Sequence, residues 1–296
     1  MSTDMMLDPQ KNAEELLEQI LDCLPRNIKS HIPGSDNFVL QSQKARQAIE
    51  TLFSTERPIP KQLGNFGNII LPYYQMGAID SLNLFDFNEL ILFAFYWQNR
   101  SRYAKTADVG ANLGLHSIIL NKCGFEVSAF EPDPLHFEIL EKNLELNKAN
   151  SVKTFNTAIS TNNGQNEFIR VKGNTTSSHL AGSKTSPYGE LETLTVPTQP
   201  FTEICAWADL IKIDIEGHEK NILLSTQKKD WHNTEALVEI STQENASAIF
   251  KHFHDLGINL FSQKTGWDLV TSLDHMPFDY RQGSLFISQL QYMPWE

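Results

Sequence analysis

Short apolar runs recur along the chain from residue 106 onward, and stretches with helical periodicity separate most of them. The runs cover residues 106–109, 127–130, 152–155, 210–215 and 236–240. Continuous apolar runs of this length are typical of strands that are buried on both faces of a parallel sheet. Strands that alternate with helices predict a doubly wound α/β domain, whose ligand lies beyond the carboxyl ends of the strands.

The helical stretches carry recognisable start signals. Asp133 can cap a helix whose first turn contains Pro134, and Phe137, Leu140 and Leu144 then share one face. Residues 257–261 and 284–287 are two further apolar runs near the end of the chain. We expect them to complete the sheet as a final pair that resembles a hairpin.

Residues 1–104 have a different pattern. Apolar positions with helical spacing occur between residues 16 and 24 and between residues 45 and 53, and residues 65–75 have the pattern of a short hairpin. Because this part precedes the first strand of the α/β pattern, it cannot supply the parallel sheet. We therefore predict a mainly helical N-terminal extension over 1–104 and an α/β domain over 105–296.

Charge and composition narrow the class of protein. The net charge of −12 repels a phosphate backbone, which argues against a nucleic-acid partner. The most apolar segment, residues 90–97, is far shorter than the roughly 20 residues that span a membrane. Cys23, Cys123 and Cys205 lack metal-binding spacing and are expected to be reduced thiols. These features predict a cytosolic protein without a membrane partner or a metal, and they leave the oligomeric state open, with a homodimer as one possibility.

The most informative segment is Asp108-Val109-Gly110-Ala111-Asn112-Leu113-Gly114, where the first strand meets the first helix of the α/β pattern. A dinucleotide fold would have three glycines in the pattern G-x-G-x-x-G, so that the pyrophosphate can approach the backbone. Counted from Gly110, the second and third glycine positions hold Asn112 and Leu115. The turn therefore favours a nucleoside without phosphates.

Two acids near this turn suggest which nucleoside. The carboxylate of Asp108 could accept a hydrogen bond from an ammonium group, and Glu131 could accept from the two hydroxyls of a ribose. This combination fits S-adenosylmethionine. An ordinary strand-to-helix turn with an incidental acid is the alternative, since single glycine motifs are weak signals.

Three segments together resemble the FkbM family of S-adenosylmethionine-dependent methyltransferases. They are DVGANLGLHS (108–117), FEPDPLHFEILEKNLELN (130–147) and LIKIDIEGHEKNIL (210–223), in the order and spacing of that family. The resemblance implies the class I methyltransferase fold, a mostly parallel seven-stranded sheet with helices on both faces, and methyl transfer to a hydroxyl or sometimes to an amide nitrogen. The cofactor-binding residues that follow from the motif and the resemblance are Asp108, Gly110, Asn112, Gly114, Glu131, Pro132, Asn156, Ala158 and Asp214.

The candidate catalytic residues lie around the strand at 210–213. Methyl transfer needs an aligned acceptor and often a base for its proton. Asp214 is our first choice and His218 our second, because both follow that strand. Glu216 is a further candidate. Glu216 and Glu219 are also three residues apart, the spacing of side chains that cap the start of a helix. Glu239 is an acid in an apolar run, which requires a partner or a position facing the cleft.

Residues that recognise the acceptor are harder to place. Tyr73 and Tyr74 could form an aromatic wall, although aromatic side chains more often serve packing. Asn174 and His179 belong to a polar loop, residues 172–190, in which the stretch 174–179 resembles a block that borders the cleft in the family. This loop could equally be flexible, and we treat a lid role as a hypothesis. Where relatives have a Thr-Leu-Asp step, this chain has Gln199-Pro200-Phe201-Thr202-Glu203, which puts a role for an acid there in doubt.

The sequence thus predicts an S-adenosylmethionine-dependent methyltransferase that methylates a hydroxyl of a small molecule or a sugar. The N-terminal extension would recognise the acceptor or cover it. N-methylation of an amide or amine, such as an asparagine side chain in a peptide, is the alternative reaction. A cofactor-binding scaffold that has lost its catalytic activity is the alternative of another class.

Overall fold

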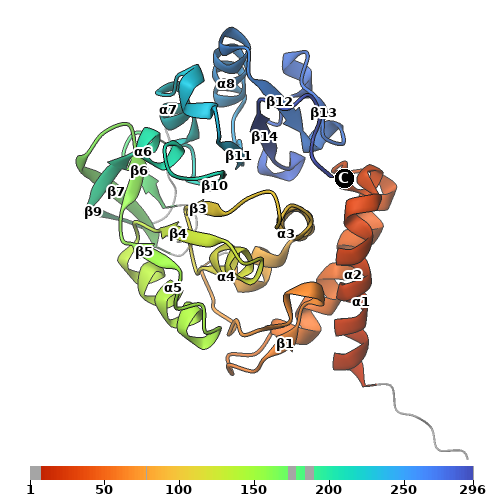
Figure 1. Cartoon of the computed structure of the whole chain (residues 1–296). Coiled ribbons are helices and arrows are strands. Elements are labelled where there is room, and N and C mark those ends of the chain that lie inside the picture. Colours follow the sequence, from red (N-terminus) through yellow and green to blue (C-terminus); the bar gives the residue numbers. More distant parts are fainter. Residues whose placement is uncertain (1–7, 78, 173–177, 184–189, 296) are drawn as a thin grey trace, which may run out of the picture.

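The computed structural model describes residues 8–77, 79–172, 178–183 and 190–295. An eight-stranded sheet forms its centre (Figure 1). In spatial order the strands are β13 (Asp268–Leu269), β12 (Asn259–Ser262), β14 (Leu285–Ser288), β11 (Glu235–Val238), β10 (Leu210–Ile213), β3 (Lys105–Val109), β4 (Glu126–Phe130) and β5 (Lys153–Phe155).

Five neighbouring strands of this sheet, from β11 to β5, run parallel. Val109 pairs with Phe130 on one side and with Ile213 on the other, so the carboxyl ends of β3, β4 and β10 lie level. β14 is antiparallel to both β11 and β12, as expected for a final pair. The class I methyltransferase fold is confirmed, and the two-residue strand β13 adds an eighth strand to the expected seven.

Helices cover both faces of the sheet. One apolar core joins the sheet to helices α1 to α5, and a second joins it to α6, α7 and α8. The α-helices are α1 (Pro9–Cys23), α2 (Asp36–Phe53), α3 (Phe87–Gln98), α4 (Leu115–Lys122), α5 (Pro134–Leu146), α6 (Phe201–Cys205), α7 (Glu219–Leu224) and α8 (Gln243–Leu256). Short 3₁₀ helices are Leu24–Arg26, Ile28–His31, Gly64–Phe66, Ser81–Phe85, Lys228–Trp231, Gln263–Thr265, Leu273–His275 and Tyr280–Gln282.

Side chains at the helix ends explain where several helices begin. Asp8 and Ser35 accept hydrogen bonds from backbone N–H groups at the starts of α1 and α2. Asp133 does the same for α5, which begins at Pro134 as the sequence predicted. α8 ends at Gly257, whose φ of 65° is the left-handed conformation that glycine adopts readily.

The N-terminal segment packs its predicted apolar faces inward. Leu17, Ile20 and Leu21 of α1 belong to the same core as the apolar residues of α3 and of the sheet. The division of the chain at residue 104 stays a prediction. The hairpin expected near 65–75 lies earlier in the chain, because β1 (Lys61–Gln62) pairs with β2 (Asn68–Ile69).

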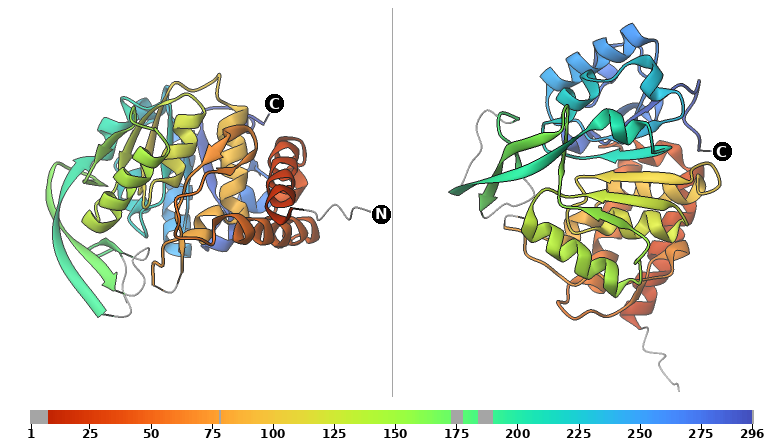
Figure 2. Two further views of the ribbon diagram at one scale, coloured as in Figure 1. Left: turned by 90° about the horizontal axis from the view of Figure 1, so that it is seen from below. Right: turned by 60° about the vertical axis from the view of Figure 1, so that its left-hand side comes forward.

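A second sheet of four strands was not predicted. Its order is β6 (Ala158–Ser160), β9 (Glu190–Pro200), β7 (Gly164–Lys172) and β8 (His179–Leu180). Figure 2 shows that it projects on the side away from α1 and α2. The long strands β7 and β9 each expose one face, so their apolar positions are too sparse to form a continuous run.

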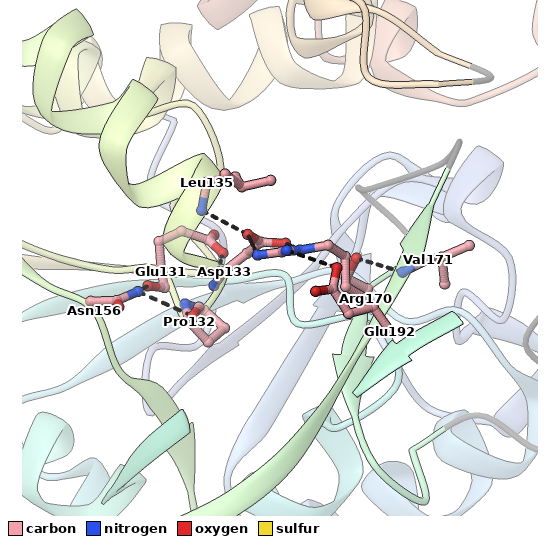
Figure 3. Close-up of polar contacts among 9 residues, drawn as sticks. Glu131, Pro132, Asp133, Leu135, Asn156, Arg170, Val171 and Glu192 are labelled. Carbon is pink, nitrogen blue, oxygen red and sulfur yellow. Dashed lines mark hydrogen bonds and ion pairs between the residues drawn. The ribbon is translucent and has the colours of Figure 1, made fainter. Parts of the chain in front are cut away.

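A buried ion pair joins the second sheet to the loop after β4 (Figure 3). The guanidinium of Arg170, on β7, donates to both carboxylate oxygens of Asp133 at 2.8 and 2.6 Å and to Glu192 at 3.0 Å. Burial alone would raise the pKa of Asp133, but the hydrogen bonds from Arg170 hold it below its ordinary value. The residue that caps α5 therefore also anchors the second sheet.

His31 joins the N-terminal segment to the end of the chain. Its Nε2 contacts the carbonyl oxygen of Leu24 at 3.0 Å, and its Nδ1 accepts a hydrogen bond from the indole N–H of Trp267 at 3.0 Å. Burial lowers the pKa of His31 to about 4, although the bond to Leu24 opposes this effect. The imidazole is therefore neutral in the folded protein at pH 7.

We predict that Arg170→Met destabilises the protein by about 3 kcal/mol, because it leaves the buried carboxylate of Asp133 without its cation. Denaturant unfolding measures the loss. Lys172→Met is the matched control, since Lys172 lies on the same strand in an exposed pair with Glu190 and its removal should change little. Equal stability of the two variants would contradict an anchoring role for Arg170.

We predict that His31 makes the protein less stable as the pH falls from about 6.5 to about 4. In this window the unfolded chain binds a proton at His31 and the folded chain does not, which costs about 3 kcal/mol for a shift of this size. Unfolding of wild type and His31→Gln between pH 7 and 4 tests this. The wild type should lose about that much more stability than the variant, and parallel curves would disprove the assignment.

Candidate active site

One cavity of about 810 Å³ lies at the carboxyl ends of the parallel strands. Gly110 and Asn112 of the glycine turn, Glu131 after β4, and Asp214 after β10 all line it. The aligned register of the strands brings these separate segments together. The cavity thus lies where a doubly wound sheet is expected to bind its ligand.

The glycine turn has three residues with positive φ. Gly110, Asn112 and Gly114 have φ values of 80°, 51° and 87°. Asparagine tolerates this region better than other residues with a Cβ, which explains how it can stand in a glycine position. A Cβ on Gly110 would overlap the carbonyl oxygen of Asp214, so this glycine is required by contact with the loop after β10.

Gly114 precedes α4 and is not among the residues that line the cavity in the described part of the chain. A Cβ there would lie close to Leu140 of α5. A glycine is therefore needed at position 114 because the turn packs closely against α5.

Glu131 is buried and faces the cavity. Its two carboxylate oxygens accept hydrogen bonds from the backbone N–H groups of Asn112 and Asp133, both at 2.8 Å. Burial raises the pKa of Glu131 to about 8, although these two bonds act in the opposite direction. The carboxyl group is thus held in a fixed orientation at the edge of the glycine turn.

Asp108 lies below the cavity, fully buried and outside the set of described lining residues. One of its oxygens accepts a hydrogen bond from Ser117 at 2.6 Å, and the other lies 3.7 Å from the ammonium of Lys212. The carboxylate that the sequence assigned to an ammonium group of the cofactor therefore contacts this chain's own lysine.

Lys212 was missed by the sequence analysis. Its ammonium donates to the carbonyl oxygen of Gly110 at 3.1 Å and lies 3.6 Å from a carboxylate oxygen of Asp214. Burial lowers the pKa of Lys212, but the carboxylates of Asp214 and Asp108 raise it above its ordinary value. A lysine inside the apolar run at 210–213 was the signal, because a buried cation requires nearby acids.

Residues after β4 and β5 form the opposite wall. Pro132 and Ala158 line the cavity, and Asn156 does not. The side-chain amide of Asn156 instead donates to the carbonyl oxygens of Glu131 and Pro132, at 2.8 and 3.1 Å (Figure 3). Asn156 therefore holds the loop that carries Glu131 in place.

The loop after β10 places Asp214, Glu216 and His218 in the cavity wall. Glu216 has a φ of 54°, an uncommon backbone conformation that occurs often at functional sites. Glu219, the first residue of α7, is buried and accepts hydrogen bonds from the N–H groups of Ile215 and Gly217, both at 3.1 Å. Glu219 thus shapes the loop from below.

His218 is enclosed by polar side chains. Its Nε2 lies 3.2 Å from the hydroxyl oxygen of Ser160, and its Nδ1 lies 3.1 Å from that of Ser183. Burial lowers the pKa of His218 to about 4. Both ring nitrogens of His218 are thus engaged by side chains of the protein, Asn221 included, so this geometry favours Asp214 over His218.

Glu239, directly after β11, also lines the cavity. Burial and the nearby carboxylate of Asp214 raise its pKa well above the ordinary value. These effects favour the protonated, uncharged form of its carboxyl group. The structure brings it to the same cavity as Asp214, from the next strand of the sheet.

The candidate acceptor residues divide into three groups. His179 of β8 is buried and lines the cavity. Tyr73 and Tyr74 are absent from the described lining residues, and the Tyr73 hydroxyl instead donates to Gln75 at 2.7 Å. Asn174 lies outside the described residues, as does most of the loop to which a lid role was assigned.

Several lining residues were not singled out from the sequence. They come from the N-terminal segment, the second sheet and the region after β13, and include Asp86, Glu89, Phe168, Leu180, Tyr280 and Arg281. Glu203, considered as a substitute acid, is exposed and accepts hydrogen bonds from Asn163 and Gln199. Elements distant in sequence meet here, so no local pattern could identify them.

Two kinds of feature, a metal-binding cluster and a membrane-spanning helix, are absent from the described residues. Among them, no group of three or more histidine, cysteine, aspartate or glutamate side chains could hold a metal ion. No helix in the described part of the chain combines the length and apolar character that crossing a membrane would need.

Comparisons with known proteins identify the family of the chain. Residues 108–261 match the family model described as the methyltransferase FkbM domain. A curated relative, methyltransferase sdnD of Sordaria araneosa, is 27% identical over 161 residues, which cover 42% of this chain and 61% of that protein. The alignment thus spans less than two thirds of the relative's length.

Solved structures with some likeness include an O-methyltransferase from Bacillus cereus in complex with SAH, which is 10% identical. It has a TM-score of 0.36, with 66% of this chain and 79% of that chain covered. An S-adenosylmethionine-dependent methyltransferase from Agrobacterium tumefaciens is 9% identical, with a TM-score of 0.38 and coverages of 77% and 68%. Because the family model matches more than half of the chain and includes the glycine turn, Glu131 and Asp214, the protein belongs to the FkbM methyltransferase domain family.

Proposed function

We propose that the protein is an S-adenosylmethionine-dependent methyltransferase that methylates a hydroxyl group on a small molecule or a sugar. The observation that carries this proposal is the single cavity that Gly110, Asn112, Glu131 and Asp214 line together. Family membership supports methyl transfer as the reaction. The preference for a hydroxyl acceptor rests on the family resemblance.

The residues present fit the cofactor. The cavity volume of about 810 Å³ lies in the range of roughly 300–1,000 Å³ that small-molecule sites occupy. Phe130, Ala158 and Ile159 provide an apolar wall for an adenine ring. The side-chain oxygen of Asn112 is buried and has no hydrogen-bond partner among the described residues, so it is available to accept from a bound ligand.

The bound cofactor would supply an activated methyl group. Glu131 would hold the ribose through its carboxylate, while Asn112 and the backbone of the glycine turn border the rest of the nucleoside. Pro132 and Ala158 would face the adenine. The apolar wall and the second sheet would exclude water from the reacting atoms.

Asp214 is our choice for the residue that orients the acceptor and takes its proton. It is partly exposed in the cavity wall, and its contact with Lys212 holds the carboxylate in place. Burial and Asp214 raise the pKa of the neighbouring Glu239 well above its ordinary value, and in its protonated form this carboxyl group can donate a hydrogen bond. Glu216 and His179 lie in the same wall and are candidates for contacts with the acceptor.

N-methylation of an amide or amine, such as a peptide asparagine, is the second candidate reaction. The cavity has walls from the N-terminal segment and from the second sheet, which favours a small acceptor over an extended peptide. A scaffold without catalysis would bind the cofactor and show no turnover with any acceptor.

We predict that Glu131→Gln weakens binding of S-adenosylhomocysteine by roughly 2 to 3 kcal/mol, because charge-assisted hydrogen bonds to the ribose are lost. With a pKa of about 8, Glu131 is mostly protonated at pH 7 in the free protein. Hydroxyl donors favour its ionised form, so binding should release a proton.

Calorimetry at pH 7 in buffers of different ionisation enthalpy measures both effects. Proton release should vanish in Glu131→Gln and persist in Glu138→Gln, an exposed glutamate on α5. Unchanged affinity of Glu131→Gln would remove Glu131 from the binding site.

We predict that Asp214→Asn binds S-adenosylhomocysteine as the wild type does and loses most of its turnover. The test is transfer of a labelled methyl group to a panel of sugars, polyketide alcohols and peptides, with Glu203→Gln as the control. Stabilisation of the protein by NAD and not by S-adenosylhomocysteine in a thermal shift would refute the proposed function. Full turnover in Asp214→Asn would refute only the role of Asp214.

A further inference from the structure

A chain of hydrogen-bonded side chains leads from the core to the cavity wall, from the buried Tyr96 and His116 to the partly buried Glu89. The hydroxyl of Tyr96, on α3, lies 3.1 Å from Nδ1 of His116, and Nε2 of His116 lies 2.8 Å from a carboxylate oxygen of Glu89. Tyr96 is fully buried and His116 almost so, while Glu89 reaches the cavity. His116 lies within the segment 108–117 that carries the family resemblance, but neither the resemblance nor the proposed function assigns a role to any of these three residues.

The chain of hydrogen bonds fixes both the orientation and the charge of Glu89. Burial raises the pKa of Tyr96 far above its ordinary value, so its hydroxyl keeps its proton. Nε2–H of His116 donates to Glu89. Burial alone would raise the pKa of Glu89, but His116 and the more distant Lys212 bring it below its ordinary value. Glu89 is therefore an ionised carboxylate that faces the cavity.

Glu89 also lies beside the glycine turn. His116 is the second residue of α4, two positions after Gly114, and its bond to Glu89 brings the first turn of α3 against the start of α4. In the proposed function Glu131 marks the ribose end of the nucleoside. The amino acid part of the cofactor would then extend past the turn.

Four other acids at or near the cavity are less suited to bind a cation. Asp108 is sealed below the cavity against Ser117 and Lys212. Asp214 shares Lys212, and burial and the nearby Asp214 raise the pKa of Glu239 well above its ordinary value, which favours its uncharged form. Asp86 lies near Arg46, at 3.9 Å.

We propose that Glu89, positioned by His116 and Tyr96, is the carboxylate that binds the ammonium group of the amino acid part of S-adenosylmethionine. This inference rests on the proposed function and gives Glu89 the role that the sequence analysis assigned to Asp108. It also makes the N-terminal segment a part of the cofactor site.

The test compares two ligands by calorimetry. One is S-adenosylhomocysteine, and the other is its desamino analogue, which has hydrogen in place of the ammonium group. Glu89→Gln should weaken binding of S-adenosylhomocysteine about 10- to 100-fold, the range expected for a hydrogen bond between charged groups, and leave binding of the analogue unchanged. Glu131→Gln should weaken both ligands, and the exposed Glu18→Gln should weaken neither.

His116→Phe tests the positioning role, because phenylalanine keeps the ring and removes the N–H donor. It should weaken S-adenosylhomocysteine selectively, and His116→Gln, which keeps a donor, should restore part of that loss. If His116→Phe does not fold, the Glu89→Gln comparison still decides the proposal.

The outcomes distinguish a failure of the role proposed for Glu89 from a failure of the proposed function. Equal weakening of both ligands in Glu89→Gln, or no weakening of either, would overturn the role of Glu89. A raised KM for the acceptor with unchanged S-adenosylhomocysteine affinity would move Glu89 to the acceptor side and also overturn it. Failure of the wild type to bind either ligand would instead overturn the proposed function.

Discussion

The buried ammonium of Lys212 is the contact on which the rest of the site depends. A charge in this position is tolerated only because Asp108, Asp214 and the carbonyl oxygen of Gly110 surround it. These groups belong to two neighbouring strands, so the cation ties the glycine turn to the loop after β10. The absence of a side chain on Gly110 lets the two loops touch. The two segments that carry the candidate cofactor and catalytic residues are thereby held together.

The loop after β4 has a similar double role at the other side of the cavity. Asp133 caps α5 and binds Arg170 of the second sheet, while Glu131, two residues earlier, faces the cavity. The placement of Phe168, His179 and Leu180 in the wall therefore depends on the same short loop that would hold the ribose. The ion pair of Asp133 with Arg170 thus connects the loop that carries Glu131 to the part of the cavity wall that the second sheet forms.

The sequence predicted what local patterns encode. The runs at 106–109, 127–130 and 210–213 became β3, β4 and β10, because strands buried on both faces leave continuous apolar segments. The second sheet escaped notice because most residues of β7 and β9 are exposed or only partly buried, so these strands leave no continuous apolar run. The sequence could place Glu131 and Asp214 near the cavity. It could not show that Asp108 is sealed in the core or that Glu89 reaches the cavity. This difference between the two acids depends on Ser117, Lys212 and His116, which reach these acids from other elements.

The position of α3 has a consequence for how such proteins diversify. This helix lies upstream of the matched family segment and shares a core with the sheet, yet its first turn supplies Glu89 to the cavity. An exchange of the upstream segment for an unrelated one would preserve the strands and the glycine turn but remove a charged group and one side of the wall. Substitutions in the first turn of α3 would therefore alter the cavity, whereas substitutions at exposed positions of α1 and α2 would leave it unchanged.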